Sequence, residues 1–511
     1  MKIACLSLLV PALRAQTLGT TNLLEGPASG GDSVVLAANG GWTASANASW
    51  LHLSVANQSG TGSTNVIFTF DANAGATHTG TLTIAGKVLT VTQAGSAYVA
   101  TSNMFQLVYS GLNMPRCVAA DGAGNVYIAD TGNNAIKEWV AASNGVITLV
   151  SSGLNQPNSV AVDGMGNVYI ADTGNNQIKE WVAASNTVIT LVASGLSSPR
   201  GVAVDSTGNV YIADTAHNAV KEWSPTNNAV TTLVSSGLNL PYGVAVDVAG
   251  NVYIADTSNN AIKEWLVNNG TLTTLVSSGL AGPRAVAVDG AGNVYIADSA
   301  HSSIKEWSPA SNTTITLGFT GLGQPSGVAA DALGNIYFSD TIRGTANEVL
   351  HAFMDTTAKV EAPGAGVDAL PAVVPLTAVL PAPLVPFTGS PWLTVVNFTN
   401  GVVNFAFTAN TSATNRTATI FGIGKVVAVT QAAVQPPFLT GFMPLGGGAF
   451  QFGFSNSQGV PFTIWTTTNI SVPFSNWTVL GLPTNLGSGQ YQFTDLTATN
   501  NASRFYRVSS P

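Results

Sequence analysis

The sequence predicts an all-β protein with a β-propeller at its centre. Between Pro115 and Pro325, a segment that reads Asn-Val-Tyr-Ile-Ala-Asp in most copies returns every 42 residues. The copies cover residues 125–139, 167–181, 209–223, 251–265 and 293–307, and a more divergent sixth copy covers 335–349. A period of roughly 40–45 residues with several short strands in each unit is typical of propellers, in which one unit forms one four-stranded blade.

Each repeat contains four candidate strands. In the third repeat these are residues 202–205, 209–213, 219–223 and 231–234, separated by Gly, Asn, Ser and Pro. The first two are unbroken apolar runs, as expected of inner strands covered on both faces by neighbouring blades. Asp205 and the Gly-Asn pair at 208–209 provide the residues that a tight hairpin between them requires.

The amino-acid sequence of the repeats resembles that of the NHL repeat. Pro199-Arg-Gly-Val-Ala-Val-Asp205 and Gly208-Asn-Val-Tyr-Ile-Ala-Asp214 follow its consensus closely, and the resemblance extends from about residue 105 to 360. It implies a six-bladed propeller. It does not imply one activity, because NHL propellers include scaffolds, RNA binders, sensors and a lyase.

Closure of the ring has two candidate strands. Residues 105–110 precede the first repeat and resemble 147–152, the outer strand of a blade, so they are expected to complete the sixth blade. Residues 357–360 compete for the same place. We favour 105–110, because a strand from the other end of the propeller closes the ring and protects its edges.

Smaller modules flank the repeats. Residues 27–96 contain Trp42, Trp50 and a final Val-Thr-Gln, and resemble a BACON domain, an immunoglobulin-like sandwich of extracellular bacterial proteins whose acronym records a suspected carbohydrate-binding role. A second, eroded copy around Trp392 follows a Pro-rich stretch that we expect to form an extended connector or edge strand. The predicted organisation is a signal peptide at 1–15, a BACON-like β-sandwich at 27–96, the propeller at 105–360, the connector at 361–391, the second BACON-like sandwich at 392–433 and a C-terminal β-sandwich at 436–511.

Composition favours a secreted protein located outside the cell or at the cell envelope. The 511 residues carry 8% charged side chains, 53 Gly and a net charge of −8. Residues 1–15 read as a short leader cut before Gln16, which would leave Cys117 as the only cysteine and permit no internal disulfide. We expect Cys117 to be a small buried residue. An excess of 25 acidic over 17 basic residues argues against nucleic acid, and no other apolar stretch is long enough to span a membrane.

Several polar and aromatic residues recur in every repeat. The first aspartates are expected to cap the hairpin tips rather than bind metal, and the second set to cap loops on the opposite rim. The five Trp from Trp139 to Trp307 are expected to pack against a neighbouring blade. Adjacent Lys-Glu residues point to opposite faces of their strand, so they form either a ladder of ion pairs between blades or solvent-facing charges. The first aspartates are Asp121, Asp163, Asp205, Asp247, Asp289 and Asp331, and the second are Asp130, Asp172, Asp214, Asp256, Asp298 and Asp340.

The candidate ligand site is the residue that follows each repeat's proline. This residue alternates, with arginine in every second repeat, as Arg116, Asn158, Arg200, Tyr242, Arg284 and Ser326. The position opens the innermost strand at the channel mouth, so three guanidinium groups would surround an anion. His217 and His301 occupy equivalent places on the rim and are included in the candidate site. The competing interpretation pairs each arginine with a rim aspartate.

Catalytic motifs are weak. A zinc-dependent NHL lyase would need about three converging histidines, and only His217 and His301 recur, so no catalytic residue is assigned. We therefore expect a non-catalytic binding or scaffold protein that engages extracellular polysaccharide, envelope or protein partners and needs no cofactor, although a divalent metal in the channel stays open. The alternative is an extracellular propeller enzyme of the lyase or lactonase type.

Overall fold

The computed structural model describes residues 16–101, 104–376, 385–434, 437–456, 461–498 and 503–509. The leader predicted at residues 1–15 lies outside these ranges. The regular structure described consists of β-strands and short 3-10 helices, and no helix there is long and apolar enough to cross a membrane. The chain forms two compact units, of which the first extends to Met354 and the second begins at Asp355.

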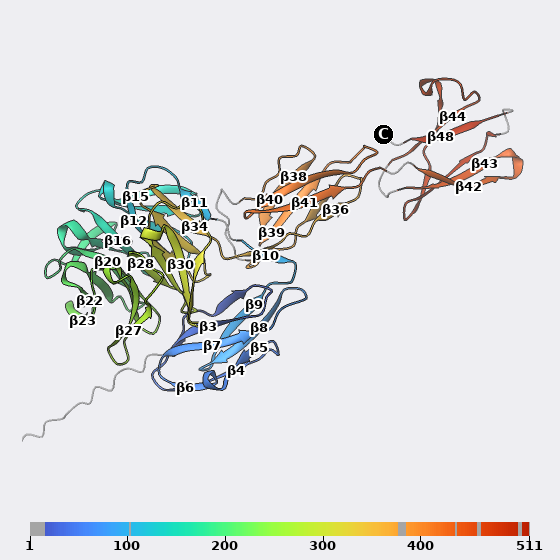
Figure 1. Ribbon diagram of the computed structural model, residues 1–511. Helices are drawn as coiled ribbons and strands as arrows, with labels where there is room; N and C mark the ends of the chain where they lie inside the picture. Colours follow the sequence, from blue (N-terminus) through green and yellow to red (C-terminus); the bar gives the residue numbers. More distant parts are fainter. Residues whose placement is uncertain are drawn as a thin grey trace, which may run out of the picture. The chain divides into compact units, whose positions relative to one another are not determined.

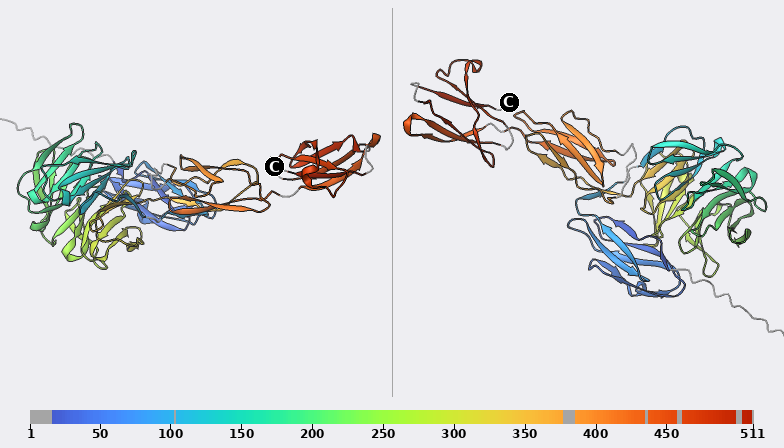
Figure 2. Two further views of the ribbon diagram at one scale, coloured as in Figure 1. Left: turned by 90° about the horizontal axis from the view of Figure 1, so that it is seen from above. Right: turned by 180° about the vertical axis from the view of Figure 1, so that it is seen from behind.

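The described residues of the repeats form six four-stranded sheets, and these are the blades of a propeller (Figure 1). The first strands of neighbouring blades lie side by side around the axis, and β12 of blade 1 closes the circle against β32 of blade 6. The ring of blades can be followed from two further sides in Figure 2. The strands are, in blade 1, β12 (Pro115–Ala120), β13 (Val126–Asp130), β14 (Ala135–Val140) and β15 (Gly145–Val150); in blade 2, β16 (Pro157–Val162), β17 (Val168–Asp172), β18 (Gln177–Val182) and β19 (Thr187–Val192); in blade 3, β20 (Pro199–Val204), β21 (Val210–Asp214), β22 (Ala219–Ser224) and β23 (Ala229–Val234); in blade 4, β24 (Pro241–Val246), β25 (Val252–Asp256), β26 (Ala261–Leu266) and β27 (Thr271–Val276); in blade 5, β28 (Pro283–Val288), β29 (Val294–Asp298), β30 (Ser303–Ser308) and β31 (Thr313–Leu317); and in blade 6, β32 (Pro325–Ala330), β33 (Ile336–Asp340) and β34 (Thr345–Val349).

The fourth strand of blade 6 comes from the other end of the propeller. Strand β11 (Met104–Val108) pairs with β34 in antiparallel register, with Phe105 opposite Glu348. The prediction that this segment closes the ring is confirmed. The competing segment lies elsewhere, because β36 (Lys359–Glu361) pairs with a strand of the second unit.

The core of the propeller lies between blades. Trp223 of blade 3 is buried among residues of blade 2 that include Tyr169 and Ile178. Trp307 packs in the same way against Tyr253 of blade 4. The predicted packing role of the recurring Trp is therefore confirmed for these blades. Along the axis the inner strands approach closely, since a Cβ atom at Gly201 would clash with the carbonyl oxygen of Tyr242 in the next blade.

The N-terminal module is a two-sheet sandwich, as predicted, but it begins at Thr17 rather than at residue 27. Its first strands had no recognisable motif, yet β2 adds to the sheet by pairing in parallel with β9. Trp42 belongs to the buried core. One sheet contains β1 (Thr17–Leu18), β3 (Gly30–Ala37), β7 (Thr64–Phe70) and β5 (Leu51–Leu53), and the other β2 (Asn22–Glu25), β9 (Lys87–Gln93), β8 (His78–Ile84), β4 (Gly41–Ala46) and β6 (Ser59–Thr61). The 3-10 helix η1 spans Val55–Asn57, and the short strands β10 (Tyr98–Ala100) and β35 (Phe353–Asp355) pair with each other.

The second unit contains two further sandwiches. The first of them begins at Lys359, earlier than the predicted residue 392. Strand β36, at the end of the segment predicted as propeller, joins one of its sheets, and β37 of the Pro-rich region joins the other. Strand β37 lies at a sheet edge, as expected of an edge strand rather than a loose connector. One sheet has the order β36-β41-β40 and the other β37-β39-β38, with β37 (Gly366–Ala369), β38 (Leu393–Thr399), β39 (Val402–Phe407), β40 (Arg416–Gly422) and β41 (Lys425–Gln431).

The N-terminal sandwich and the first sandwich of the second unit contain an equivalent buried hydrogen bond from an asparagine side chain. The Asn73 amide donates to the carbonyl of Ala94 at 3.0 Å, and the Asn410 amide donates to that of Ala432 at 2.9 Å.

The C-terminal sandwich packs around Phe452 and Phe454. Its strands are β42 (Phe438–Pro444), β43 (Phe450–Ser455), β47 (Gln490–Asp495) and β46 (Thr484–Gly487) in one sheet, and β45 (Thr478–Gly481), β44 (Thr463–Thr467) and β48 (Phe505–Ser509) in the other, with the 3-10 helices η8 (Gly446–Gly448) and η9 (Phe474–Asn476).

Candidate ligand-binding site in the propeller channel

The first aspartate of each repeat caps the hairpin between the first two strands. In blade 1, the Asp121 carboxylate accepts the backbone N–H of Asn125 at 2.9 Å and the Tyr127 hydroxyl at 3.2 Å. The same contacts recur in the other five blades. The prediction of a turn cap is confirmed.

The second aspartate lies on the opposite rim, where its side chain is fully buried. Asp130 accepts the backbone N–H of Asn113 at 2.7 Å and the Asn133 amide at 2.8 Å, so it caps the loop as predicted. It also forms an ion pair with Lys137 at 2.7 Å. Equivalent Lys–Asp pairs at 2.6–2.9 Å occur in blades 2 to 5.

These pairs show that the predicted ladder of Lys–Glu ion pairs is wrong. The alternative, solvent-facing charges, is wrong for the lysines, because each is paired with an aspartate. Lys137 is opposite Ile128 in the sheet and therefore shares a face with Asp130, whereas Glu138 is opposite Tyr127 on the other face. Each lysine therefore neutralises a buried rim aspartate of its own blade.

The two rim histidines also hold these aspartates. His217 Nδ1 lies 2.7 Å from Asp214 Oδ2, and His301 Nδ1 lies 2.8 Å from Asp298 Oδ2, where blades 1, 2 and 4 use an asparagine. They occupy the 3-10 helices η4 (Thr215–His217) and η6 (Ser299–His301), which follow the second strand as do η2 (Thr131–Asn133), η3 (Thr173–Asn175) and η5 (Thr257–Asn259). Neither histidine lines the channel cavity. The structure therefore separates them from the candidate arginine site.

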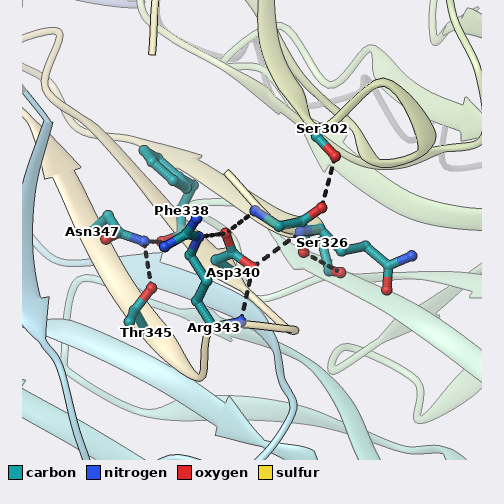
Figure 3. A network of polar contacts seen from close by, with 9 residues as sticks. Ser302, Ser326, Phe338, Asp340, Arg343, Thr345 and Asn347 are labelled. Atoms are coloured by element: carbon teal, nitrogen blue, oxygen red, sulfur yellow. Dashed lines mark hydrogen bonds and ion pairs between the residues drawn. The ribbon is translucent and has the colours of Figure 1, made fainter. Parts of the chain in front are cut away.

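Blade 6 departs from this pattern (Figure 3). Asn347 replaces the lysine, and its amide donates to Thr345 Oγ1 at 3.0 Å. Asp340 is capped by the backbone N–H groups of Gly323 at 2.6 Å and Arg343 at 3.1 Å, while the Arg343 Nε lies 3.8 Å from its carboxylate. Arg343 thus lies on the same rim as the channel arginines, but it is half exposed and forms its ion pair with the rim aspartate Asp340.

The six residues after the prolines do come together. All six line one cavity of about 210 Å³ in the propeller channel, whose remaining lining is mostly the Val and Ala of the innermost strands. Arg116 Nη1 donates to Asn158 Oδ1 at 2.9 Å, and the Arg200 guanidinium carbon lies 4.3 Å from the centre of the Tyr242 ring. The volume is below the roughly 300–1000 Å³ of pockets for drug-sized molecules, so the cavity suits a small ligand.

The positive charge of this cavity has no acidic partner among the described residues. No Asp or Glu belongs to the lining, and the rim aspartates are occupied by lysine, histidine and backbone N–H groups. The pairing of each arginine with a rim aspartate is therefore not observed. Burial, followed by the proximity of Arg284 and Arg200, lowers the pKa of Arg116. The Nε atoms of Arg116 and Arg200 are buried without a hydrogen-bond partner.

Cys117 faces the same inner strand region. Burial raises the pKa of its thiol, and Ser159 Oγ approaches its Sγ at 3.5 Å. A thiol with a raised pKa is protonated at neutral pH and poorly reactive. Cys117 is, however, half-buried and lines the cavity, whereas the sequence predicted a buried residue. Within the described part of the chain, no group of three or more His, Cys, Asp or Glu is placed to hold a metal ion.

Sequence reasoning missed how the arginines are held. The Arg116–Asn158 hydrogen bond and the Arg200–Tyr242 stack each join residues separated by one repeat of 42. An alignment of the repeats places the members of each pair at equivalent positions of adjacent blades, and this could have indicated that they are neighbours. The direction in which each side chain leans could not be obtained from that alignment.

Comparison with known proteins agrees with the repeat assignment. The NHL repeat model matches residues 112–139, 154–181, 196–223 and 238–265. The BACON model, described as "Putative binding domain, N-terminal", matches residues 40–94. No curated protein matches the sequence significantly.

Solved structures with a similar fold include proteins of several activities. A streptogramin B lyase shares 11% identity with a TM-score of 0.40, covering 49% of this chain and 97% of the other. A gluconolactonase from Xanthomonas campestris shares 16% with a TM-score of 0.42, covering 48% and 88%. An auxiliary nutrient binding protein from Bacteroides thetaiotaomicron shares 11% with a TM-score of 0.42, covering 66% and 96%.

Proposed function

We propose that this NHL-repeat propeller protein with a BACON domain is a secreted, non-catalytic binding protein that captures a small oxyanion in its channel. The observation that carries the proposal is the convergence of Arg116, Arg200 and Arg284 on one cavity that contains no acidic side chain. Like charges brought together in a partly desolvated space are costly unless a ligand of opposite charge joins them.

A carboxylate is the ligand group that fits this cavity best. The planar guanidinium group of arginine donates two parallel hydrogen bonds to a carboxylate. Three arginines from alternate blades of a six-bladed ring can share one ligand with two or three such groups. Asn158, Tyr242 and Ser326 lie between them and add neutral hydrogen-bonding groups. The apolar Val and Ala below exclude water and strengthen the attraction.

The flanking sandwiches supply the second part of the proposal. We expect them to attach the protein to extracellular polysaccharide, envelope or protein partners, a role supported by the composition of the chain and by the binding role in the BACON description. The alternative of a lyase or lactonase needs an acid or base that acts on the substrate. The lining of the cavity includes no His, Asp or Glu.

Calorimetric titration of the full chain tests the channel site. The probes are citrate, galacturonate and inorganic phosphate, with galactose as the uncharged comparison, in low salt. We expect the carboxylates to bind and galactose not to bind, and we expect affinity to fall as salt is raised. The triple variant R116Q/R200Q/R284Q should lose measurable binding.

The matched control is R343Q, because Arg343 lies on the same rim but outside the cavity. It should bind as the unaltered protein does. Equal binding by the triple variant, or galactose binding as tight as galacturonate binding, would contradict the proposal.

A further inference from the structure

The N-terminal sandwich is docked on one particular hairpin of the propeller, the tip between β28 and β29 of blade 5. Ser33 Oγ donates to the carbonyl of Ala291 at 2.5 Å, and the Val35 backbone N–H donates to that of Gly290 at 3.1 Å. Gly19 and Gly290 approach so closely that a Cβ atom on Gly19 would clash with the Gly290 carbonyl oxygen.

Blade 1 offers a direct comparison, because its tip has the same sequence, Asp-Gly-Ala-Gly-Asn, at 121–125 as blade 5 has at 289–293. In blade 1 Gly122 and Ala123 are exposed, whereas in blade 5 the equivalent Gly290 is half-buried and Ala291 is buried. The docking therefore depends on what the sandwich brings to blade 5.

The sandwich brings two carboxylates to a place that already holds two. Glu25 of β2 and Asp32 of β3 are hydrogen-bonded to each other, and Asp32 also contacts Asn293 at the hairpin tip. Asp289 of the tip and Glu306 of β30 complete the group, which we call the interface carboxylates.

Two other titratable groups lie at this interface. The hydroxyl of Tyr295 on β29 donates to Asp289 at 3.0 Å. His351 Nε2 lies 3.0 Å from the carbonyl oxygen of Leu24, next to Glu25. In the described part of the chain, the ion pairs found include none between a Lys or Arg and these four acids.

These four carboxyl groups are half-buried and close together, so ionising all of them is unfavourable while the sandwich is docked. Burial, and next the charge of Asp289, raises the pKa of Asp32 from 3.8 to about 6. Burial, then Asp289 and Asp32, raises the pKa of Glu306 to about 7. Burial and the neighbouring Asp32 raise the pKa of Glu25 well above its ordinary value. One Glu25 oxygen is buried without a hydrogen-bond partner, as suits a carboxyl group that keeps its proton and donates it to Asp32.

We propose that protons held by the interface carboxylates fasten the N-terminal sandwich to blade 5, and that their removal releases it. The docked state binds more protons than the released state, so docking weakens as pH rises. The contribution of Asp32 is complete below about pH 4 and is lost as pH rises through about 6. Glu306 and Glu25 extend the loss to neutral pH and above.

Hydrogen exchange of the Val35 amide in the full chain measures this docking, because its N–H is donated across the interface. The measurement is made at pH 5.0 and 8.5 in buffer with EDTA, corrected for the intrinsic effect of pH on exchange. Strand β21 of blade 3 serves as the internal reference. We expect protection at Val35 to fall at least tenfold at pH 8.5 while β21 stays protected. Between pH 5.0 and 8.5, the rise of the Asp32 pKa from 3.8 to about 6 corresponds to a change of ~10-fold in the docking equilibrium.

Two conservative variants and one matched control test the cause. D32N and E306Q each remove one charge with little change of shape, so they should keep Val35 protected at pH 8.5. E138Q, at the equivalent place in the uncovered blade 1, should respond to pH as the unaltered protein does. Constant protection of Val35 between pH 5.0 and 8.5 would overturn the proposal. An equal loss of Val35 protection in D32N would also overturn it.

Discussion

At the scale of single residues, the six residues after the blade prolines occupy equivalent backbone positions, but their side chains make different contacts. Arg116 is partly satisfied by Asn158, and Arg200 lies against Tyr242. The charge of Arg284 lowers the pKa of Arg116, and among the described residues no hydrogen bond, ion pair or ring contact holds the Arg284 guanidinium group. Its guanidinium group is therefore the most available of the three for a ligand.

Arg284 should consequently contribute most to binding. A charge-assisted hydrogen bond is worth ~1.5–3 kcal/mol, so R284Q is expected to weaken citrate binding by ~10–150-fold. Without ligand the variant should be at least as stable as the unaltered protein, because it removes repulsion from Arg116. Calorimetry and a thermal melt give both values, and a marked loss of stability without ligand would contradict this account.

For the rim lysines we predict the opposite. Their replacement should lower the stability of the protein and leave ligand binding in the channel unchanged. Lys179 is paired at 2.6 Å with Asp172, whose carboxylate is fully buried. Removing one partner of a buried pair leaves an unpaired charge and costs ~3–5 kcal/mol. K179M should therefore lower the free energy of unfolding by about this amount in urea, whereas K87M, at an exposed position of the N-terminal sandwich, should change it little.

At the scale of elements, much of the propeller could be predicted from the sequence, because the same pattern of apolar strands and turn residues recurs in each repeat. The repeat also placed the two aspartate sets on opposite rims. It could not identify the partner of Lys137, because that depends on which face of β14 the side chain occupies and on the nearby Asp130. Nor could it show that β36 and β37 belong to the second sandwich, since their Pro-rich surroundings lack the alternation of a strand.

Ring closure by β11 can be tested against its former competitor. Leu107 is 5% exposed within the blade 6 sheet, while Val360 is 77% exposed. L107D places a charge in the core and should destabilise the propeller by about 3–5 kcal/mol. V360D should leave the propeller transition unchanged. The measurement is urea unfolding followed by tryptophan fluorescence, and similar effects of the two variants would contradict the assignment.

At the scale of the whole molecule, two kinds of binding surface are expected in one chain. The channel offers a positively charged cavity of about 210 Å³, a volume that suits a small ligand rather than a polymer. The sandwiches carry the remaining aromatic candidates, but the structure limits them. Trp42 is a core residue, Trp50 stacks on His78 at 4.4 Å, and Trp392 lies under the Arg416 guanidinium at 4.4 Å. A polysaccharide contact is therefore better assigned to a domain than to one tryptophan.

If the channel binds a small ligand and the sandwiches bind polysaccharide, polysaccharide affinity should not depend on the channel arginines. The full chain is incubated with insoluble cell-wall polysaccharides, and the bound fraction is compared with that of the R116Q/R200Q/R284Q variant. We expect equal retention, because the altered side chains line a cavity whose volume suits a small ligand rather than a polymer. The second unit, residues 355–511, forms a compact body with its own cores and should retain part of the affinity alone. Loss of retention in the triple variant, or full retention by the propeller segment 104–354 by itself, would place the polysaccharide site in the propeller instead.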